Sequence, residues 1–244
     1  MAALDIPALW DFDQPAQSEE RFRAALAGSA GDARLELLTQ IARTYSLRKR
    51  FEEAHRLLDE IEPQLANAGP APRLRYLLER GRTFRSGGLP DKARPLFVAA
   101  WDLGGASGLD GLAIDAAHMV ALVEPKTEDQ LAWNRRALEL AQRATDTYAR
   151  NWLASLYNNI GWSLHDAARY AEALEHFEAA LKERERRQQV NEIRIAKWAV
   201  ARCLRSLGRR GEALAIQLAL KAEWAAEGKT DQHVMEELEQ LGVR

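Results

Sequence analysis

The stretch that decides the fold runs from residue 157 to residue 180 and reads YNNIGWSLHDAARYAEALEHFEAA. Small and apolar residues recur in it at the three- and four-residue spacing of an α-helix, in two successive stripes. The first stripe contains Tyr157, Ile160, Gly161 and Leu164. The second contains Tyr170, Ala173, Leu174, Phe177, Ala180 and Leu181. The stretch therefore predicts a helix-turn-helix hairpin whose two apolar stripes face inward.

The same pattern returns along the chain with a nearly constant period. The second helices align on the motifs that end in Ala54, Ala93, Ala173 and Ala213, which gives intervals of 39, 80 and 40 residues. The interval of 80 residues hides one more repeat, which centres on Trp133. Twelve residues before each anchor stands a small residue, namely Ala42, Gly81, Ala121, Gly161 or Ala201. Small side chains let one helix approach its partner closely, so we expect five hairpins.

The third repeat departs from this rule, because Trp133 stands where the other repeats have alanine. Either the third hairpin is splayed to admit the indole, or Ala132 takes the contact after a shift of one residue. A capping box at Thr127-Glu128-Asp129-Gln130 is expected to start the second helix of this repeat. We expect a bend or a dedicated contact site here.

The sequence has no sustained alternation of valine, isoleucine and threonine, so a sheet is excluded and the fold class is all-α. We expect an N-terminal capping segment at 1–31 and a C-terminal capping helix at 229–244, because the end repeats of a stack need one covered and one polar face. Aromatic and leucine residues around a helix near Pro15, and a short amphipathic stretch near Val234, suit these caps. The five repeats between them are expected at about 32–69, 70–108, 109–145, 146–189 and 190–228.

Composition and charge disfavour several classes of protein. The 34 basic and 36 acidic residues give no global field that would draw the chain to nucleic acid. No apolar run approaches the roughly 18 residues of a membrane span, and the first nine residues lack the basic start of a signal peptide. A soluble protein in the cytoplasm is expected.

The sequence also lacks the motifs of metal and catalytic sites. Neither H-E-x-x-H, G-x-S-x-G nor a Walker motif occurs, so we expect no catalytic activity, no cofactor and no metal. The pairs Asp115–His118 and His165–Asp166 fall short of the pattern of a metal site. Cys203 is the only cysteine and stands among apolar residues, which predicts a buried structural thiol.

Residues 157–180 resemble a complete signature of the tetratricopeptide repeat, through Y-x-x-I-G-x-x-L followed by Y-x-x-A-x-x-x-F-x-x-A. The second repeat matches nearly as well through Gly81, Ala93 and Phe97, and the first and fifth are recognisable. The resemblance covers about 32–228, with a repeat length near 40 residues instead of roughly 34. It implies a right-handed superhelical solenoid, in which the first helices line a concave groove and the second helices form the convex back.

The resemblance also implies which residues face the groove, where this family usually binds its ligands. Those positions are Thr39, Gln40, Arg43, Leu78, Glu79, Arg82, His118, Met119, Leu122, Asn158, Asn159, Trp162, Trp198, Ala199 and Arg202. The three arginines could bind carboxylates through bidentate hydrogen bonds, and the two tryptophans offer a stacking surface. Alternatively, the arginines pair with glutamates such as Glu36 and Glu79, and one tryptophan belongs to the core between repeats.

The expected function is that of an adaptor that binds a protein or peptide partner with acidic and aromatic character in the groove. A chaperone-type carboxylate clamp is not expected, because Ile195 and Ala199 stand where that clamp needs cations. A second hypothesis is self-association as a structural scaffold, through aromatic residues near Trp10, Trp101, Trp133 or Trp224. An RNA-binding protein or an enzyme is disfavoured by the charge balance and the missing catalytic motifs.

Overall fold

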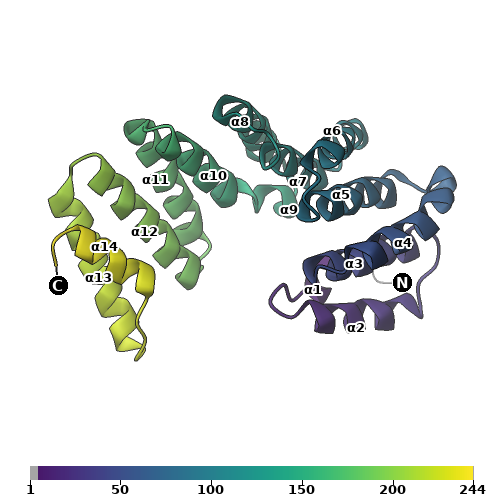
Figure 1. The fold of residues 1–244 in the computed structure, drawn as a ribbon, viewed down its shortest axis with the longest axis horizontal. Coiled ribbons are helices and arrows are strands. Elements are labelled where there is room, and N and C mark those ends of the chain that lie inside the picture. The colour runs from purple at the N-terminus through teal and green to yellow at the C-terminus, as the bar shows by residue number, and fades with distance from the viewer. Residues whose placement is uncertain (1–4, 244) are drawn as a thin grey trace. The chain divides into compact units, whose positions relative to one another are not determined.

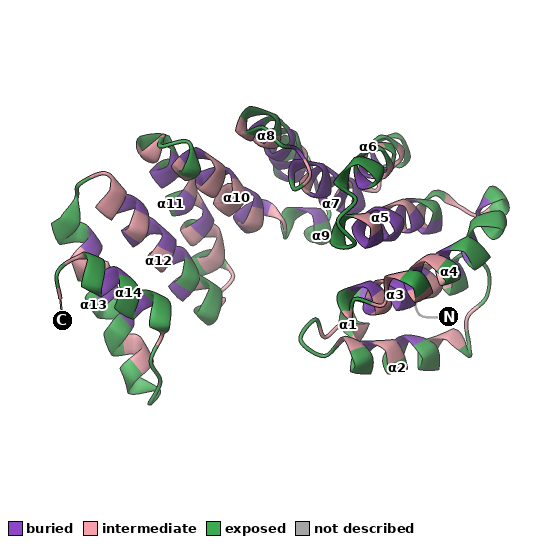
Figure 2. Cartoon of the chain, in the orientation of Figure 1, coloured by how far each residue is buried: buried purple, intermediate pink, exposed green. Residues whose placement is uncertain are grey.

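The structure of the protein is a computed structural model, which describes residues 5–243. Every regular element in these residues is a helix, which confirms the predicted all-α class (Figure 1). Buried and exposed residues alternate along the helices, as expected for amphipathic helices that pack side by side (Figure 2). Within the described range, no helix is both long and apolar enough to cross a membrane.

The chain divides into two compact units, Met1–Glu124 and Pro125–Arg244, called unit 1 and unit 2 below. The helices of unit 1 are α1 (Ile6–Leu9), α2 (Pro15–Leu26), α3 (Gly31–Leu47), α4 (Phe51–Ile61), the 3-10 helix η1 (Glu62–Asn67), α5 (Pro70–Ser86), α6 (Pro90–Ser107) and α7 (Asp110–Ala121). The helices of unit 2 are α8 (Thr127–Arg143), α9 (Thr147–Arg150), α10 (Leu153–Asp166), α11 (Tyr170–Arg186), α12 (Val190–Ser206), α13 (Arg210–Ala226) and α14 (Gln232–Gln240).

Hairpins account for the packing inside each unit. In unit 1, α3 packs against α4 and α5 packs against α6, while α2 covers α3 and α7 covers α6. In unit 2, α10 pairs with α11 and α12 with α13, while α8 packs against α10 and α14 against α13. The helix expected near Pro15 does begin there, as α2. The division of the chain into five repeats stays a prediction.

The third predicted hairpin is divided between the two units, because α7 lies in unit 1 and α8 in unit 2. Trp133 is buried and Ala132 is exposed, so the idea that Ala132 takes the close contact is wrong. The capping box is also wrong in detail. Thr127 is the first residue of α8, and Lys126 holds the N-cap position without a side-chain hydrogen bond.

A glycine facing an aromatic ring sets the closest approach in two of the hairpins. A Cβ atom placed on Gly161 would lie 2.7 Å from ring atoms of Phe177, and one on Gly81 would lie 2.4 Å from the ring of Phe97. Both rings are buried, and real Cβ atoms essentially never come so close to a neighbour. The predicted role of the small residues at these two positions is confirmed. A glycine is needed at each because the phenylalanine ring of the second helix fills the space that a side chain would occupy.

The fifth repeat places an amide at the corresponding position of its second helix. Gln217 follows Ala201 by the same interval that separates Phe177 from Gly161. It is fully buried, and neither its Nε2 nor its Oε1 atom has a hydrogen-bond partner among the described residues. A buried amide without partners costs free energy, because it loses its hydrogen bonds to water.

Replacing Gly161 by leucine is expected to destabilise unit 2 by about 3 kcal/mol, because Phe177 would have to leave its buried position. Urea unfolding followed by circular dichroism measures this difference. The matched control is Gly105→Leu, at a helical position of α6 with open space around its Cα, which should change stability far less. Equal effects of the two substitutions would contradict the close contact.

Replacing Gln217 by leucine is expected to raise the stability of unit 2 by about 1 to 2 kcal/mol, because the buried amide is removed and apolar contacts are gained. Thermal melting of the full chain measures the change. Leu218, the next residue, is exposed, so Leu218→Gln serves as a control that should leave the melting temperature nearly unchanged. A lower melting temperature for Gln217→Leu would overturn this account of the fifth repeat.

Candidate binding surface

Three first helices of unit 1 are joined by a buried network of charges. Arg43 on α3 and Arg82 on α5 both donate to Oε1 of Glu79, at 3.3 Å and 2.6 Å. Arg82 also donates to Oδ1 of Asp115 on α7 at 2.5 Å. Glu79, Arg82 and Asp115 are buried, so solvent screens these interactions little. Arg43 and Arg82 therefore pair with carboxylates of the chain itself, as the alternative interpretation of the sequence expected.

The network controls the protonation of its buried acid. Burial raises the pKa of Asp115, but the opposing charges of Arg82 and Arg43, with the hydrogen bond from Arg82, hold it below its usual value. Asp115 therefore stays ionised at neutral pH and contributes stability there. Burial also lowers the pKa of the nearby His118. Of the pair Asp115–His118 on α7, Asp115 thus serves the charge network as the partner of Arg82.

The N-terminal segment covers part of the same face. The rings of Trp10 and Phe12 stack with centroids 4.6 Å apart, and the guanidinium of Arg43 lies 5.5 Å and 5.2 Å from their centroids. Nε1 of Trp10 donates to Oε1 of Gln40 at 3.0 Å. Two predicted groove residues of α3, Gln40 and Arg43, are thus already in contact with another part of this chain.

Burial separates the predicted groove residues of unit 1 from those of unit 2. Most of the predicted groove residues in unit 1 are buried, namely Thr39, Gln40, Leu78, Glu79, Arg82 and Met119. The exceptions are Arg43 and His118, which are half-buried, and Leu122, which is exposed. In unit 2 five are half-buried and thus partly open to solvent, namely Asn158, Asn159, Trp162, Trp198 and Arg202, while Ala199 is buried. We call those five residues the α10–α12 face.

Two indoles and an arginine form the centre of the α10–α12 face. The rings of Trp162 and Trp198 have centroids 5.9 Å apart. The guanidinium of Arg202 lies 5.7 Å from the first centroid and 5.4 Å from the second. The ring of Phe177 meets that of Trp162 edge-on at 4.9 Å, so the hairpin core supports this indole. The structure therefore brings Trp162, Trp198 and Arg202 together.

Positive charge is in excess at this centre. Glu237 on α14 accepts two hydrogen bonds from Arg205, at 2.7 Å and 3.0 Å, and lies 3.7 Å from Arg202. One buried carboxylate thus serves two arginines. Burial, and then the charge of Arg202, lowers the pKa of the neighbouring His165. The Arg202 side chain is 39% exposed, so an anionic group of a ligand can reach it.

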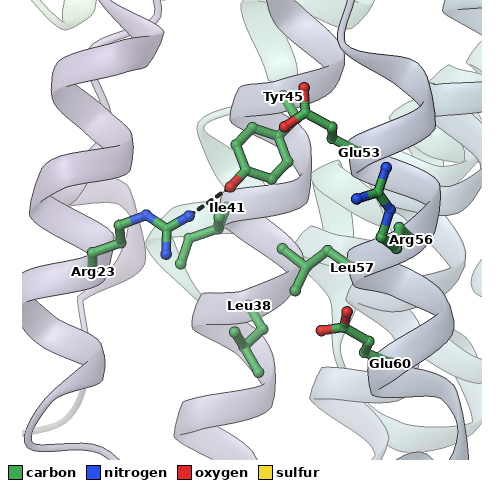
Figure 3. A pocket seen from close by; sticks show the side chains of 8 residues that line it. All are labelled: Arg23, Leu38, Ile41, Tyr45, Glu53, Arg56, Leu57 and Glu60. Carbon is green, nitrogen blue, oxygen red and sulfur yellow. Dashed lines mark hydrogen bonds between the residues drawn. The ribbon is translucent and has the colours of Figure 1, made fainter.

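Two cavities lie beside these helices. In unit 1, a cavity of about 270 Å³ between α2, α3 and α4 has an apolar floor and charged residues at its rim, where Arg23 donates to the Tyr45 hydroxyl (Figure 3). In unit 2, a cavity of about 320 Å³ is lined by Arg194, Ile195, Trp198, Trp224, Asp231, His233 and Val234. Of the residues lining the second cavity, only Trp198 was predicted for the groove.

The described residues offer no metal site and one buried thiol. Residues 5–243 contain no group of three or more histidine, cysteine or acidic side chains that could hold a metal ion. Cys203 is buried, as predicted, and its thiol lies 3.2 Å from the carbonyl oxygen of Tyr170. Burial raises the pKa of this thiol to about 11, so it is protonated at neutral pH and is a poor nucleophile.

The sequence profile of the tetratricopeptide repeat family matches residues 34–61 and 153–187. These segments contain the hairpin of α3 and α4 and the hairpin of α10 and α11. These two hairpins are tetratricopeptide repeats. No curated protein matches its sequence.

Solved structures share the fold of this chain. BtubC (BKLC) from P. vanneervenii is 18% identical, with a TM-score of 0.70 over 93% of this chain and 94% of the other. The apo form of RapI is 15% identical, with a TM-score of 0.75 over 94% of this chain and 66% of the other. NprR, solved with its cognate peptide NprX, is 15% identical, with a TM-score of 0.57 over 97% of this chain and 69% of the other.

Removing Arg82 from the buried network by Arg82→Met is expected to cost about 3 to 5 kcal/mol at pH 7, because Asp115 and Glu79 lose their closest cation. Since the folded-state pKa of Asp115 is depressed in the parent, its contribution is present above roughly pH 4 and is lost as the pH falls further. The difference between parent and variant should therefore shrink on acidification. Urea unfolding at pH 7 and at pH 3.5 measures it.

The control for this experiment is Arg209→Met, which removes an exposed, solvent-screened ion pair with Glu212 and should change the stability little at either pH. If Arg82→Met behaves like this control, the network does not hold the first helices of unit 1 together.

Proposed function

We propose that this tetratricopeptide repeat protein is an adaptor that binds a peptide segment of a partner protein on the α10–α12 face. The observation that carries the proposal is the partly exposed pair of indoles with Arg202 beside both rings. Aromatic residues and arginine are enriched where proteins bind each other, because they combine a large apolar area with directed polar groups.

The surroundings of the two sets of groove residues favour unit 2 over unit 1. A ligand that displaced Glu79 or Asp115 from Arg82 would have to leave buried carboxylates unpaired, which costs several kcal/mol. Arg202 can bind a further anion without leaving Glu237 unpaired, because Arg205 already donates two hydrogen bonds to that carboxylate. The first-helix residues of unit 1 are therefore proposed to stabilise the fold rather than to bind the partner.

Two further observations support the adaptor proposal. NprR, which has the same fold, was solved with a peptide bound, so the fold is compatible with peptide binding. The half-buried amides of Asn158 and Asn159 lie on the same helix as Trp162, and amide side chains can donate to and accept from the backbone of an extended peptide. We propose that the protein acts in the cytoplasm, where a single buried thiol needs no oxidising environment.

A photo-crosslinking experiment tests this proposal. A benzophenone amino acid at Asn158 is expected to form adducts with a discrete partner in an extract of the cells that produce the protein, and the same group at exposed Ala215 on α13 should form none. Adding the substitution Arg202→Gln should reduce the Asn158 adduct at least tenfold while the melting temperature stays close to that of the parent.

The masses of the adducts separate the proposal from its rival. An adduct of two copies of this chain would indicate self-association instead of adaptor function. Unchanged adducts from a folded Arg202→Gln protein would show that the α10–α12 face is not the binding surface.

A further inference from the structure

The cavity of unit 2, called here the Trp198–Trp224 pocket, has an apolar wall that the fold leaves uncovered. Ile195 on α12 is 63% exposed at one side of it, and Trp198, Trp224 and Val234 supply the remaining apolar surface. A volume of about 320 Å³ is at the lower end of the range of ligand pockets, roughly 300 to 1,000 Å³. The pocket therefore suits one bulky side chain rather than a whole cofactor.

The charged groups around the pocket are already bonded within the chain. Arg194 donates to Glu223 at 3.2 Å and to Glu227 at 2.5 Å, and its guanidinium lies 4.4 Å from the Trp224 ring centroid. Asp231 accepts from the backbone N–H of Val234 at 3.0 Å and so caps α14. Apart from Nη1 of Arg194, which has no hydrogen-bond partner among the described residues, these groups are bonded within the chain, so the uncovered wall offers mainly apolar contact.

The side of the pocket next to α10 carries the unbalanced positive charge. Trp198 forms part of the pocket wall and also lies beside Arg202, which shares one carboxylate with Arg205. If a peptide places an apolar side chain in the pocket, its next residues towards Trp162 lie close to the guanidinium of Arg202. An acidic residue close to the apolar one complements this arrangement.

The chain itself contains a segment that combines aromatic and acidic residues. In unit 1 this segment contacts the first helix α3. Residues 10–13 read Trp-Asp-Phe-Asp, and the two aromatic rings of this segment lie against Arg43. Arg43 and Arg202 occupy the same position in their repeats, by the register of the small residues Ala42 and Ala201. Phe12 is 57% exposed even in this position, and its ring stacks on Trp10 at 4.6 Å and lies 5.2 Å from the guanidinium of Arg43.

We propose that the Trp198–Trp224 pocket binds a bulky aromatic side chain of the partner peptide, and that a carboxylate of a neighbouring peptide residue binds Arg202. This inference rests on the proposed adaptor function and assigns the chemistry of the ligand: an acidic, aromatic segment of the type Trp-Asp-Phe-Asp. The aromatic ring fills the apolar wall, and the carboxylate neutralises the excess charge between α12 and α14.

Binding of a defined peptide to the full chain tests the proposal. The probe is the acetylated and amidated peptide with the sequence of residues 8–14, Ala-Leu-Trp-Asp-Phe-Asp-Gln, which is titrated into protein with ¹⁵N-labelled indoles. The expected result is saturable shifts of the Trp198 and Trp224 indole signals. A peptide with alanine at both aromatic positions should lose these shifts, and one with asparagine for both aspartates should bind at least fivefold more weakly.

Two substitutions on the same helix provide the matched comparison. Ile195→Gln removes an apolar wall of the pocket and should weaken binding at least fivefold, whereas Val190→Gln, at a residue 60% exposed but outside the pocket lining, should leave it unchanged. Arg202→Gln should abolish the difference between the acidic peptide and its asparagine variant.

Several outcomes would overturn the proposal: shifts confined to the Trp10 signal, equal binding of the alanine peptide, equal effects of the two α12 substitutions, or no binding at millimolar peptide. If the crosslink at Asn158 forms while the peptide does not bind, the pocket assignment fails and the adaptor function stands. If neither is observed, both fail.

Discussion

The contact of Phe177 with Gly161 is the interaction on which the candidate surface depends. With no side chain on the glycine, the aromatic ring of α11 can lie directly against α10, and the hairpin closes. The same ring meets the edge of Trp162, the residue after the glycine, at 4.9 Å. Trp162 in turn lies 5.9 Å from Trp198. A packing contact in the hairpin core thus places the aromatic residues that we propose to bind the partner.

The fold uses arginine at one repeat position for two purposes. Arg43 and Arg82 belong to a buried network with Glu79 and Asp115, in which each charge has an opposite charge close by. Arg202 has only a share of Glu237 and keeps an exposed side chain. Charge balance, rather than residue type, therefore separates an arginine that stabilises the fold from one that is available to a ligand.

The sequence predicts the helical hairpins well, because their register follows from local spacing. Gly81 and Gly161 could be assigned to close contacts from the repeat alone, since each lies at a fixed distance from an anchor in its own hairpin. The splitting of the third repeat was foreseen only as an irregularity at Trp133. Whether α7 and α8 belong to one compact unit depends on packing between helices, which a periodic pattern does not encode.

The candidate surface was predictable only in part, because partners far apart in the sequence decide which groove positions stay open. Asp115 neutralises Arg82 from α7, and Trp10 covers Gln40 from the N-terminal segment. Neither pairing has a local signal. The run Trp-Asp-Phe-Asp at residues 10–13 was a visible clue, because aromatic residues next to acids suit a neighbouring cation.

The central claim is that the first-helix face of unit 2 is open to a partner and that of unit 1 is closed by the fold. Hydroxyl-radical footprinting of the full chain, with and without the crosslinked partner, measures the reactivity of individual side chains and tests this claim directly. The account predicts that the partner protects Trp162 and Trp198 from oxidation and leaves Trp10 and Met119 unchanged. Protection of Trp10 and Met119, with Trp162 and Trp198 as reactive as in the free protein, would contradict it.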